Sequence, residues 1–302
     1  MSITAAILLI ISAATHAGWN FISKKEHPTQ AFYLVANTMG VMCVLPVLFY
    51  YRHQIDLIPL AVWLYAVMSG FFLAAYLEAL AGSYRNGDIS IAYPLARALP
   101  VLFVFGFTLF SGQSKPLGVW FILGAVLVVG GCIILPLKAL RDFQISNLKN
   151  LCVVLAVLAA VGISGYTVTD DIALRHLREL PEKPFAPIEG TLIYMVLEGI
   201  SCSLWQSLFV LLQSRERANF TDVLHYYKGA AATTGIGIYL TYGLVLMSMN
   251  FVTNVSYVAA FRQLSIPIGA LLGMALLREP RYNPKIIAVV MIFIGLILVG
   301  LG

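Results

Sequence analysis

The chain has 302 residues, of which 60% are hydrophobic and only 11% are charged. Soluble domains carry about 25% charged residues, so this composition excludes an ordinary soluble enzyme and indicates lipid as the main solvent. The formal charge of +5 lies in polar loops, with no basic stripe interleaved with aromatics, so it indicates orientation in a membrane and no nucleic-acid partner.

Ten apolar runs follow one another along the chain. A helix needs roughly 20 apolar residues to cross a bilayer core of about 30 Å, and its backbone groups must be satisfied internally, so each run predicts a membrane-spanning helix. The runs cover residues 2–22, 31–50, 59–82, 89–110, 116–137, 150–169, 190–212, 228–248, 254–277 and 285–301. The polar stretch 138–149 divides the runs into five and five, and 170–187 is the longest expected loop.

Local matches between the two halves indicate a duplication. Arg97 in GDISIAYPLARALP and Arg262 in TNVSYVAAFRQLSIP each lie about nine residues into a run and precede a proline. Trp19 in the first run aligns with Tyr166 in the sixth, and a glycine precedes each of them. A repeat with an odd number of spans must sit inverted relative to its copy, as in many secondary transporters. The sequence therefore predicts an all-α membrane protein of two inverted five-helix repeats around a central cavity.

The five-plus-five organisation, the aromatic-Asn pair Trp19-Asn20 and the segment GDISIAYPLAR resemble the drug/metabolite transporter superfamily, specifically its EamA-type ten-span branch. The resemblance covers essentially the whole chain and implies a cavity that opens alternately to each side. It implies transport of small metabolites, amino acids or drugs, commonly outward. Asp170-Asp171 and the long segment after them depart from the family pattern. The two expected EamA-type repeats comprise residues 1–140 and 150–302.

Basic residues predict the orientation. Apart from Arg97 and Arg262, 17 of the 19 Lys and Arg residues remain, with 12 in loops after odd-numbered runs and 5 in loops after even-numbered runs. The positive-inside rule then places the odd loops in the cytoplasm and both termini outside. We expect a multi-pass protein of a prokaryotic plasma (inner) membrane.

Charges inside spans cost at least about 2.5 kcal/mol at the helix centre, so each is a candidate functional group. Arg97 and Arg262 lie at equivalent depth in their runs. Because a guanidinium binds a carboxylate or phosphate well, they predict a bound organic anion. The alternative is structural, with each arginine paired to an internal carboxylate or to a carbonyl freed by a nearby proline.

Glu198 shares one helical face with Tyr194, Ser201 and Trp205, which predicts a cavity wall with Trp205 in contact with substrate. Apolar surroundings penalise an ionised carboxylate, so Glu198 is a candidate proton carrier. The alternative is a structural ion pair. Glu78, nearer the end of its run, is a second proton-coupling candidate and also fits an interfacial carboxylate.

His16 shares a face of the first run with Asn20, with Trp19 beside them. His16 is a third proton-coupling candidate, although a lone histidine on an apolar helix also serves as an interhelix hydrogen bonder. Trp19 and Asn20 are substrate-binding candidates because the resemblance marks that end of the run as cavity-facing. Tyr166 joins them through the internal match. Asp170 and Asp171 fit simple helix-end carboxylates.

Several classes of chemistry lack a sequence signature. The four cysteines lie in apolar runs without CxxC spacing, so we expect neither a metal site nor a disulfide framework. Walker, GxSxG and HExxH motifs are missing, so we expect no cofactor and no enzymatic activity. The sequence predicts a secondary transporter, monomeric or homodimeric, that exports small polar or amphipathic metabolites, amino-acid-like or organic anions, with protons as a coupling ion. The alternatives are an uptake permease and a non-transporting membrane scaffold or receptor.

Overall fold

A computed structural model describes residues 1–25, 29–86, 89–111, 117–137, 139, 151–181, 184–276 and 280–301. Within these ranges the side chains of 20–25, 84–86, 89–95, 273 and 276 are outside the description. The described part of the chain is helical and contains no strand, which confirms the all-helical prediction.

Each apolar run of the sequence coincides with one helix or with consecutive helical segments, and three further short helical segments of the described residues, Arg52–Ile55, Ser214–Asp222 and Val223–Tyr227, lie between runs. The elements are α1 (Ile3–Lys25), α2 (Gln30–Val44), α3 (Pro46–Tyr50), α4 (Arg52–Ile55), α5 (Leu60–Asn86), α6 (Ile89–Ser111), α7 (Val119–Ile134), α8 (Leu151–Arg178), α9 (Pro187–Leu212), α10 (Ser214–Asp222), η3 (Val223–Tyr227), α11 (Lys228–Met249), α12 (Ser256–Phe261), η4 (Arg262–Leu264), α13 (Ser265–Leu276) and α14 (Asn283–Leu301).

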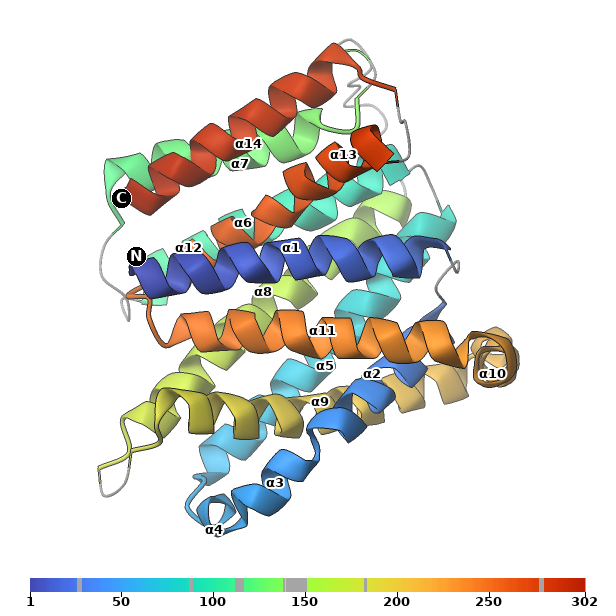
Figure 1. Ribbon diagram of the computed structural model, residues 1–302, viewed down its shortest axis with the longest axis vertical. Coiled ribbons are helices and arrows are strands. Elements are labelled where there is room, and N and C mark those ends of the chain that lie inside the picture. Colours follow the sequence, from blue (N-terminus) through green and yellow to red (C-terminus); the bar gives the residue numbers. More distant parts are fainter. Residues whose placement is uncertain are drawn as a thin grey trace.

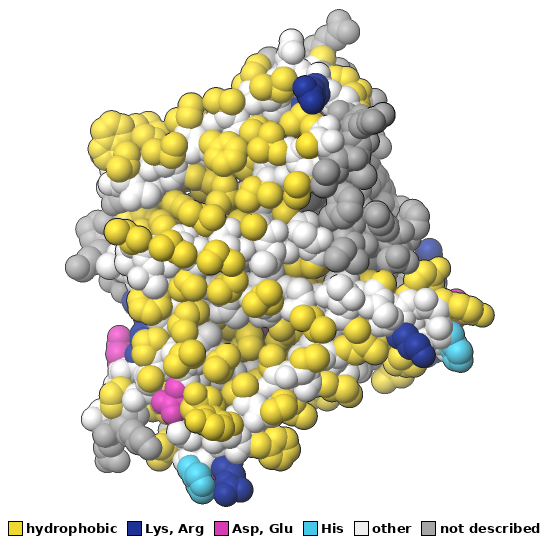
Figure 2. Space-filling model, viewed as in Figure 1, with side chains coloured by type: hydrophobic (Ala, Val, Ile, Leu, Met, Phe, Trp, Pro, Cys, Tyr) yellow, Lys and Arg dark blue, Asp and Glu magenta, His cyan; other side chains and the backbone are white. Residues whose placement is uncertain are grey.

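Six helical stretches among the described residues are long and apolar enough to cross a bilayer, which is the makeup of a multi-pass integral membrane protein. They are Gln30–Tyr50, Leu60–Ser83, Leu151–Arg178, Pro187–Leu212, Ser214–Met249 and Asn283–Leu301. Hydrophobic side chains are spread across the face shown in Figure 2, and most of its charged side chains lie toward the edges.

Part of the expected loop at 170–187 is wrong, because α8 continues through Arg178. Three side chains on one face of this extension, Ala173, Leu174 and Leu177, are buried. Asp171 also pairs with Arg175 one turn later at 3.0 Å, so the polar residues do not interrupt the helix. The extension places Asp170 inside a long helix rather than at its end.

Prolines divide two of the apolar runs. Pro46 separates α2 from α3, and the 3₁₀ turn η4 separates α12 from α13 just before Pro267. Proline lacks an N–H, and its ring crowds the carbonyl four residues earlier, so regular α-helical bonding fails at this point. A 3₁₀ turn inside a helix often marks a hinge. Arg262 is the first residue of that turn.

The helices pack in adjacent pairs drawn from distant parts of the sequence (Figure 1). α5 packs along α8, α1 along α11, and α7 along α14. Further contacts join α2 to α11, α5 to α9, and α6 to α8. The two chain ends lie on the same side of the bundle.

The α7–α14 pair is held together by glycines. A Cβ built on Gly124 would lie 2.4 Å from the carbonyl oxygen of Gly295, and one on Gly295 would lie 2.7 Å from that of Gly124. Such spacing requires glycine on both helices. Because lipid gives apolar helices no hydrophobic reason to associate, close backbone packing of this kind supplies the attraction.

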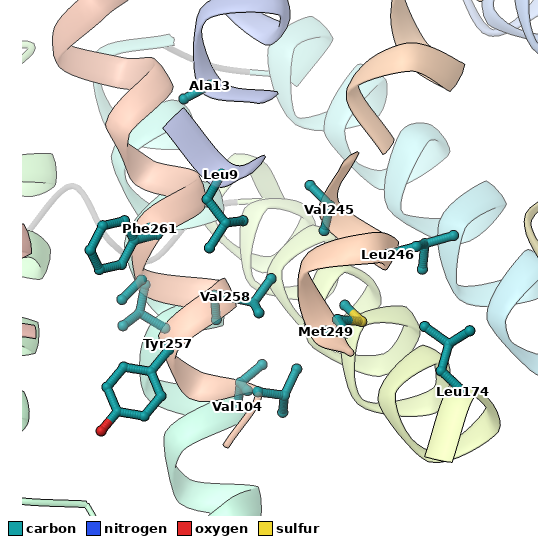
Figure 3. Packing of buried hydrophobic residues seen from close by; sticks show 14 of the residues in the cluster. Leu9, Ala13, Val104, Leu174, Val245, Leu246, Met249, Tyr257, Val258 and Phe261 are labelled. Atoms are coloured by element: carbon teal, nitrogen blue, oxygen red, sulfur yellow. The ribbon is translucent and has the colours of Figure 1, made fainter. Parts of the chain in front are cut away.

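The main apolar core lies between the central helices (Figure 3). Leu9 of α1, Val258 and Phe261 of α12, and Leu246 and Met249 of α11 contribute to one cluster of buried side chains. Several members of this cluster, among them Ala13, Val245 and Ala259, also line the cavity described next.

Candidate functional site

A cavity of about 100 Å³ lies among the central helices. Its walls come from α1, α2, α5, α6, α8, α9, α11, α12 and η4. Polar and aromatic side chains are concentrated here although the surrounding helices are apolar. The principal ones are His16, Trp19, Asn37, Tyr76, Arg97, Tyr166, Glu198, Tyr239, Tyr242 and Arg262.

Arg97 contacts His16 in this cavity, with 3.0 Å between Nη2 and the imidazole Nε2. A guanidinium has only donors, so Arg97 donates and Nε2 accepts, which assigns the neutral imidazole with its proton on Nδ1. The Trp19 ring meets the His16 ring edge-on, with centroids 4.8 Å apart. The buried Trp19 Nε1 has no hydrogen-bond partner among the described residues, so the cavity wall retains an unused donor.

Arg262 is held by two hydroxyl groups of α8. Its Nη2 donates to the Tyr166 hydroxyl at 2.5 Å, and its Nη1 donates to Thr167 Oγ1 at 3.3 Å. The guanidinium carbon lies 5.2 Å from the centre of the Tyr166 ring, a cation–π distance. No carboxylate of the described residues lies within ion-pair distance of Arg262, so its direct polar contacts among these residues are neutral hydroxyls. The partners of Arg262 among the described residues are therefore neutral hydroxyls, and not the carboxylate or carbonyl of the structural alternative.

A second polar cluster joins α5, α8, α9 and α11. Ser69 Oγ lies 2.5 Å from Asp170 Oδ1 and 3.0 Å from Glu198 Oε1. Tyr242 contacts Asp170 Oδ2 and also Glu198 Oε1, the latter at 2.8 Å. Tyr194 donates to Asp170 Oδ1 at 3.0 Å. Both carboxyl side chains are fully buried, so this network places two acids beside each other away from bulk water.

The other predicted residues take different positions. Trp205 donates from Nε1 to the Val67 carbonyl at 3.3 Å and packs against Phe71, and it is not part of the cavity wall described above. Glu78 is partly buried on α5 and is likewise absent from that wall. The Asn20 side chain lies outside the described residues. The structure brings together Trp19, His16, Arg97, Tyr166, Glu198 and Arg262.

Sequence reasoning did not select Asp170, Ser69, Tyr242 or Asn37 as site residues. Asn37 donates to the Gly199 carbonyl at 3.3 Å and accepts from the Tyr239 hydroxyl at 3.0 Å, joining α2, α9 and α11. An asparagine inside an apolar run was a usable signal. Asp170 could be selected only if α8 was known to continue past it. A single Ser or Tyr in an apolar run does not by itself indicate a site.

Described side chains include no group of three or more His, Cys, Asp or Glu that could hold a metal ion. The cavity therefore offers guanidinium, indole, phenol and carboxyl groups, a set suited to holding a small organic anion and exchanging protons.

Comparison with known proteins establishes the fold. No family model matches the chain. No curated protein matches it either. A solved structure described only as "Crystal structure of protein" is similar, with a TM-score of 0.68 at 15% sequence identity over 98% of this chain and 97% of that one. At this identity the similarity establishes a shared fold across the whole length.

Proposed function

We propose that this chain is a secondary active transporter of the drug/metabolite superfamily, EamA type, that exports small metabolites by alternating access. The observation that carries the proposal is a cavity between the central helices with Arg97 and Arg262 in its wall. A charged residue within a membrane span is costly, and spans keep such residues mainly where a ligand or ion passes.

The packing pattern supports two inverted five-helix repeats. Exchanging α1 with α8, α2 with α9, α5 with α11, α6 with α12–α13, and α7 with α14 maps the main contacts onto one another. The α1–α11 pair becomes α8–α5, the α2–α11 pair becomes α9–α5, and the α6–α8 pair becomes α12–α13 with α1, all of which are in contact. The α7–α14 pair maps onto itself. Such two-fold exchange is the pattern of a duplicated transporter with ten spans.

The two arginines then come from equivalent helices of opposite repeats and meet at one cavity. Between them they supply planar donors for a carboxylate or phosphate. Arg262, whose direct contacts are neutral hydroxyls, is the one that a substrate anion pairs with. The aromatic rings of Trp19, Tyr166 and Tyr242 suit the apolar part of an amphipathic metabolite.

The 3₁₀ turn of η4 supports a moving Arg262. A turn of this kind is a place where a helix can change direction, and Arg262 lies on it beside the hydroxyls of α8. A bend at this turn would move the Arg262 guanidinium relative to the hydroxyls of α8. Substrate access would then alternate without any ATP-binding site.

The test is solute flux in liposomes containing the full-length protein, with a panel of amino acids, nucleobases and organic acids. We expect flux of at least one solute bearing a carboxylate or phosphate, lost in Arg262→Gln and Arg97→Gln. Asp222→Asn, an exposed carboxylate on α10, serves as the matched control and should transport normally. Flux unaffected by both arginine variants contradicts the anion site. Absence of flux for the whole panel favours a receptor or scaffold.

Orientation and direction of transport are tested in cells and in membrane vesicles. The excess of basic residues in odd loops supports cytoplasmic odd loops in a prokaryotic inner membrane, with both termini outside. Cell-surface labelling of a single cysteine placed at either terminus tests this orientation. Loading substrate inside or outside inverted membrane vesicles then separates export from uptake.

A further inference from the structure

We infer that Asp170 and Glu198 form one proton-binding site in which a single proton is shared by the two carboxyl groups. The ligand is a proton from water that enters the cavity. A hydronium ion in the cavity water gives up this proton: its O–H bond breaks as the carboxyl O–H bond forms, and a water molecule is left. Release of the proton reverses the step. Proton binding is a property of the folded protein alone, whereas its use in coupling rests on the proposed transport function.

The first argument is a count of hydrogens. Five contacts join the cluster: Ser69 to each acid, Tyr242 to each acid, and Tyr194 to Asp170. Three hydroxyl groups supply only three hydrogens. If both acids were ionised, two of these contacts would set one oxygen lone pair against another. A carboxyl proton fills one such contact and removes the like-charge repulsion of the pair.

The second argument is independent of these contacts. Glu198 lies in the cavity wall, and its second oxygen, Oε2, is buried without a hydrogen-bond partner among the described residues. A buried carboxylate oxygen with no donor is costly. Glu198 Oε2 is the one carboxyl oxygen of the pair that no described hydroxyl contacts, so a proton from cavity water can reach it before Ser69 and Tyr242 link it to the rest of the pair.

The surroundings favour a proton over a metal ion. The titratable or charged groups around the pair are Tyr166 on α8, Tyr194 and Cys202 on α9, Tyr239 and Tyr242 on α11, and Arg262 on η4, while α5 contributes Ser69. Arg262 is the only cation in this set. The carboxyl and hydroxyl oxygens already lie at hydrogen-bond distance from each other, which suits a proton between them and leaves no gap for a larger cation.

A short aromatic path connects the acid pair to the anion site. Tyr242 contacts both acids, its ring lies 6.1 Å from that of Tyr166 in an edge-on arrangement, and Tyr166 binds Arg262. An anion that binds Arg262 removes positive potential from this neighbourhood and so increases the proton affinity of the pair. Linkage requires the reciprocal effect, so a proton on the pair strengthens anion binding.

Infrared difference spectroscopy of the full-length protein in lipid nanodiscs tests the shared proton without any transport substrate. In the unaltered protein we expect one carbonyl band of a buried, protonated carboxylic acid at pH 7. Labelling aspartate with ¹³C and labelling glutamate with ¹³C should each shift part of this band. That measurement needs no variant and does not depend on one folding.

The variants give a second test. Glu198→Gln and Asp170→Asn should each change the band at pH 7, because each variant removes one of the two carboxyl groups that hold the proton. Glu179→Gln and Asp222→Asn, both exposed carboxylates, should leave the band unchanged. Two outcomes contradict the shared site: a band that only one of the two variants changes, or no band at pH 7 in the unaltered protein. Loss of the band on adding Na⁺ at constant pH would assign a sodium site instead.

A second measurement separates this inference from the proposed transport. If flux is found, Glu198→Gln should stop proton-driven accumulation while exchange of substrate for substrate continues, because exchange moves no net proton. A band that behaves as expected in a protein without flux leaves the proton site standing and removes only its transport role. Full proton-driven accumulation by Glu198→Gln excludes the pair from coupling.

Discussion

The α7–α14 pair and the central cavity show two different uses of apolar helices. α7 contains no charged residue, and it meets α14 through glycine backbones at Gly124 and Gly295. The cavity helices instead bring Arg262, Asp170 and Glu198 into the interior. Packing in the first region needs no polar group, because close approach and dispersion suffice. The concentration of costly groups in the second region indicates function rather than stability.

The strongest test of this contrast is Arg262→Gln. Glutamine keeps hydrogen-bonding capacity and removes the charge, so it separates folding from anion binding. Arg262 and a bound anion would form a buried charge pair. Removing one member of such a pair costs about 2–5 kcal/mol, which predicts a loss of anion transport on the order of 100-fold at low substrate concentration. Thermal unfolding in detergent should change little. If the variant loses both folding and transport, Arg262 has a structural role.

Gly124→Ala should have the opposite profile. Its Cβ would meet the Gly295 backbone oxygen, so we expect a loss of about 1–3 kcal/mol in unfolding free energy. Transport per folded molecule should be unchanged. Gly106 on α6 is the matched control, because a Cβ there meets no described atom within 4 Å. Gly106→Ala should stabilise the helix by up to about 1 kcal/mol. Equal effects of the two substitutions would contradict glycine-mediated packing of α7 on α14.

Tyr166→Phe sharpens the cavity side of the comparison. It removes the hydroxyl that accepts from Arg262 and keeps the ring under the guanidinium. A hydrogen bond to a charged group contributes about 1.5–3 kcal/mol, so the apparent substrate affinity should change by about 10-fold or more. Flux against substrate concentration measures the change. Tyr50→Phe, at an exposed tyrosine, should match the unaltered protein, and an unchanged affinity in Tyr166→Phe would exclude the hydroxyl as a positioning group.

The smallest effect on transport is expected for Trp205→Phe. The indole donates to the Val67 carbonyl outside the described cavity, so its loss should cost roughly 1 kcal/mol of stability and leave substrate affinity within about 2-fold. The same flux assay and unfolding curve measure both quantities. A marked loss of affinity would restore Trp205 to the binding site that its spacing from Glu198 predicts.

Much of the helical pattern could be predicted because it depends on composition over about 20 residues, a length that lipid thickness imposes. The run at 150–169 was correct as a helix, but its end was placed too early. The buried positions Leu174 and Leu177 continue the helix, and their burial depends on neighbours that the local sequence does not name. The sequence also indicated that Arg97, Glu198 and Arg262 lie deep within their runs, and all three lie in the cavity wall.

By itself, the sequence determined that lipid surrounds most of the chain and that each buried charge costs free energy. Both follow from the transfer of a side chain to lipid, which depends on that side chain and its immediate neighbours. Only the tertiary structure decided which charges meet. Helix rotation and the packing of α5, α8, α9 and α11 bring Asp170 and Glu198 to the same two hydroxyls, and they direct Trp205 toward Val67. A turn of less than one residue step about a helix axis changes such partners while leaving hydrophobicity the same. The chemistry of this site is therefore a consequence of packing.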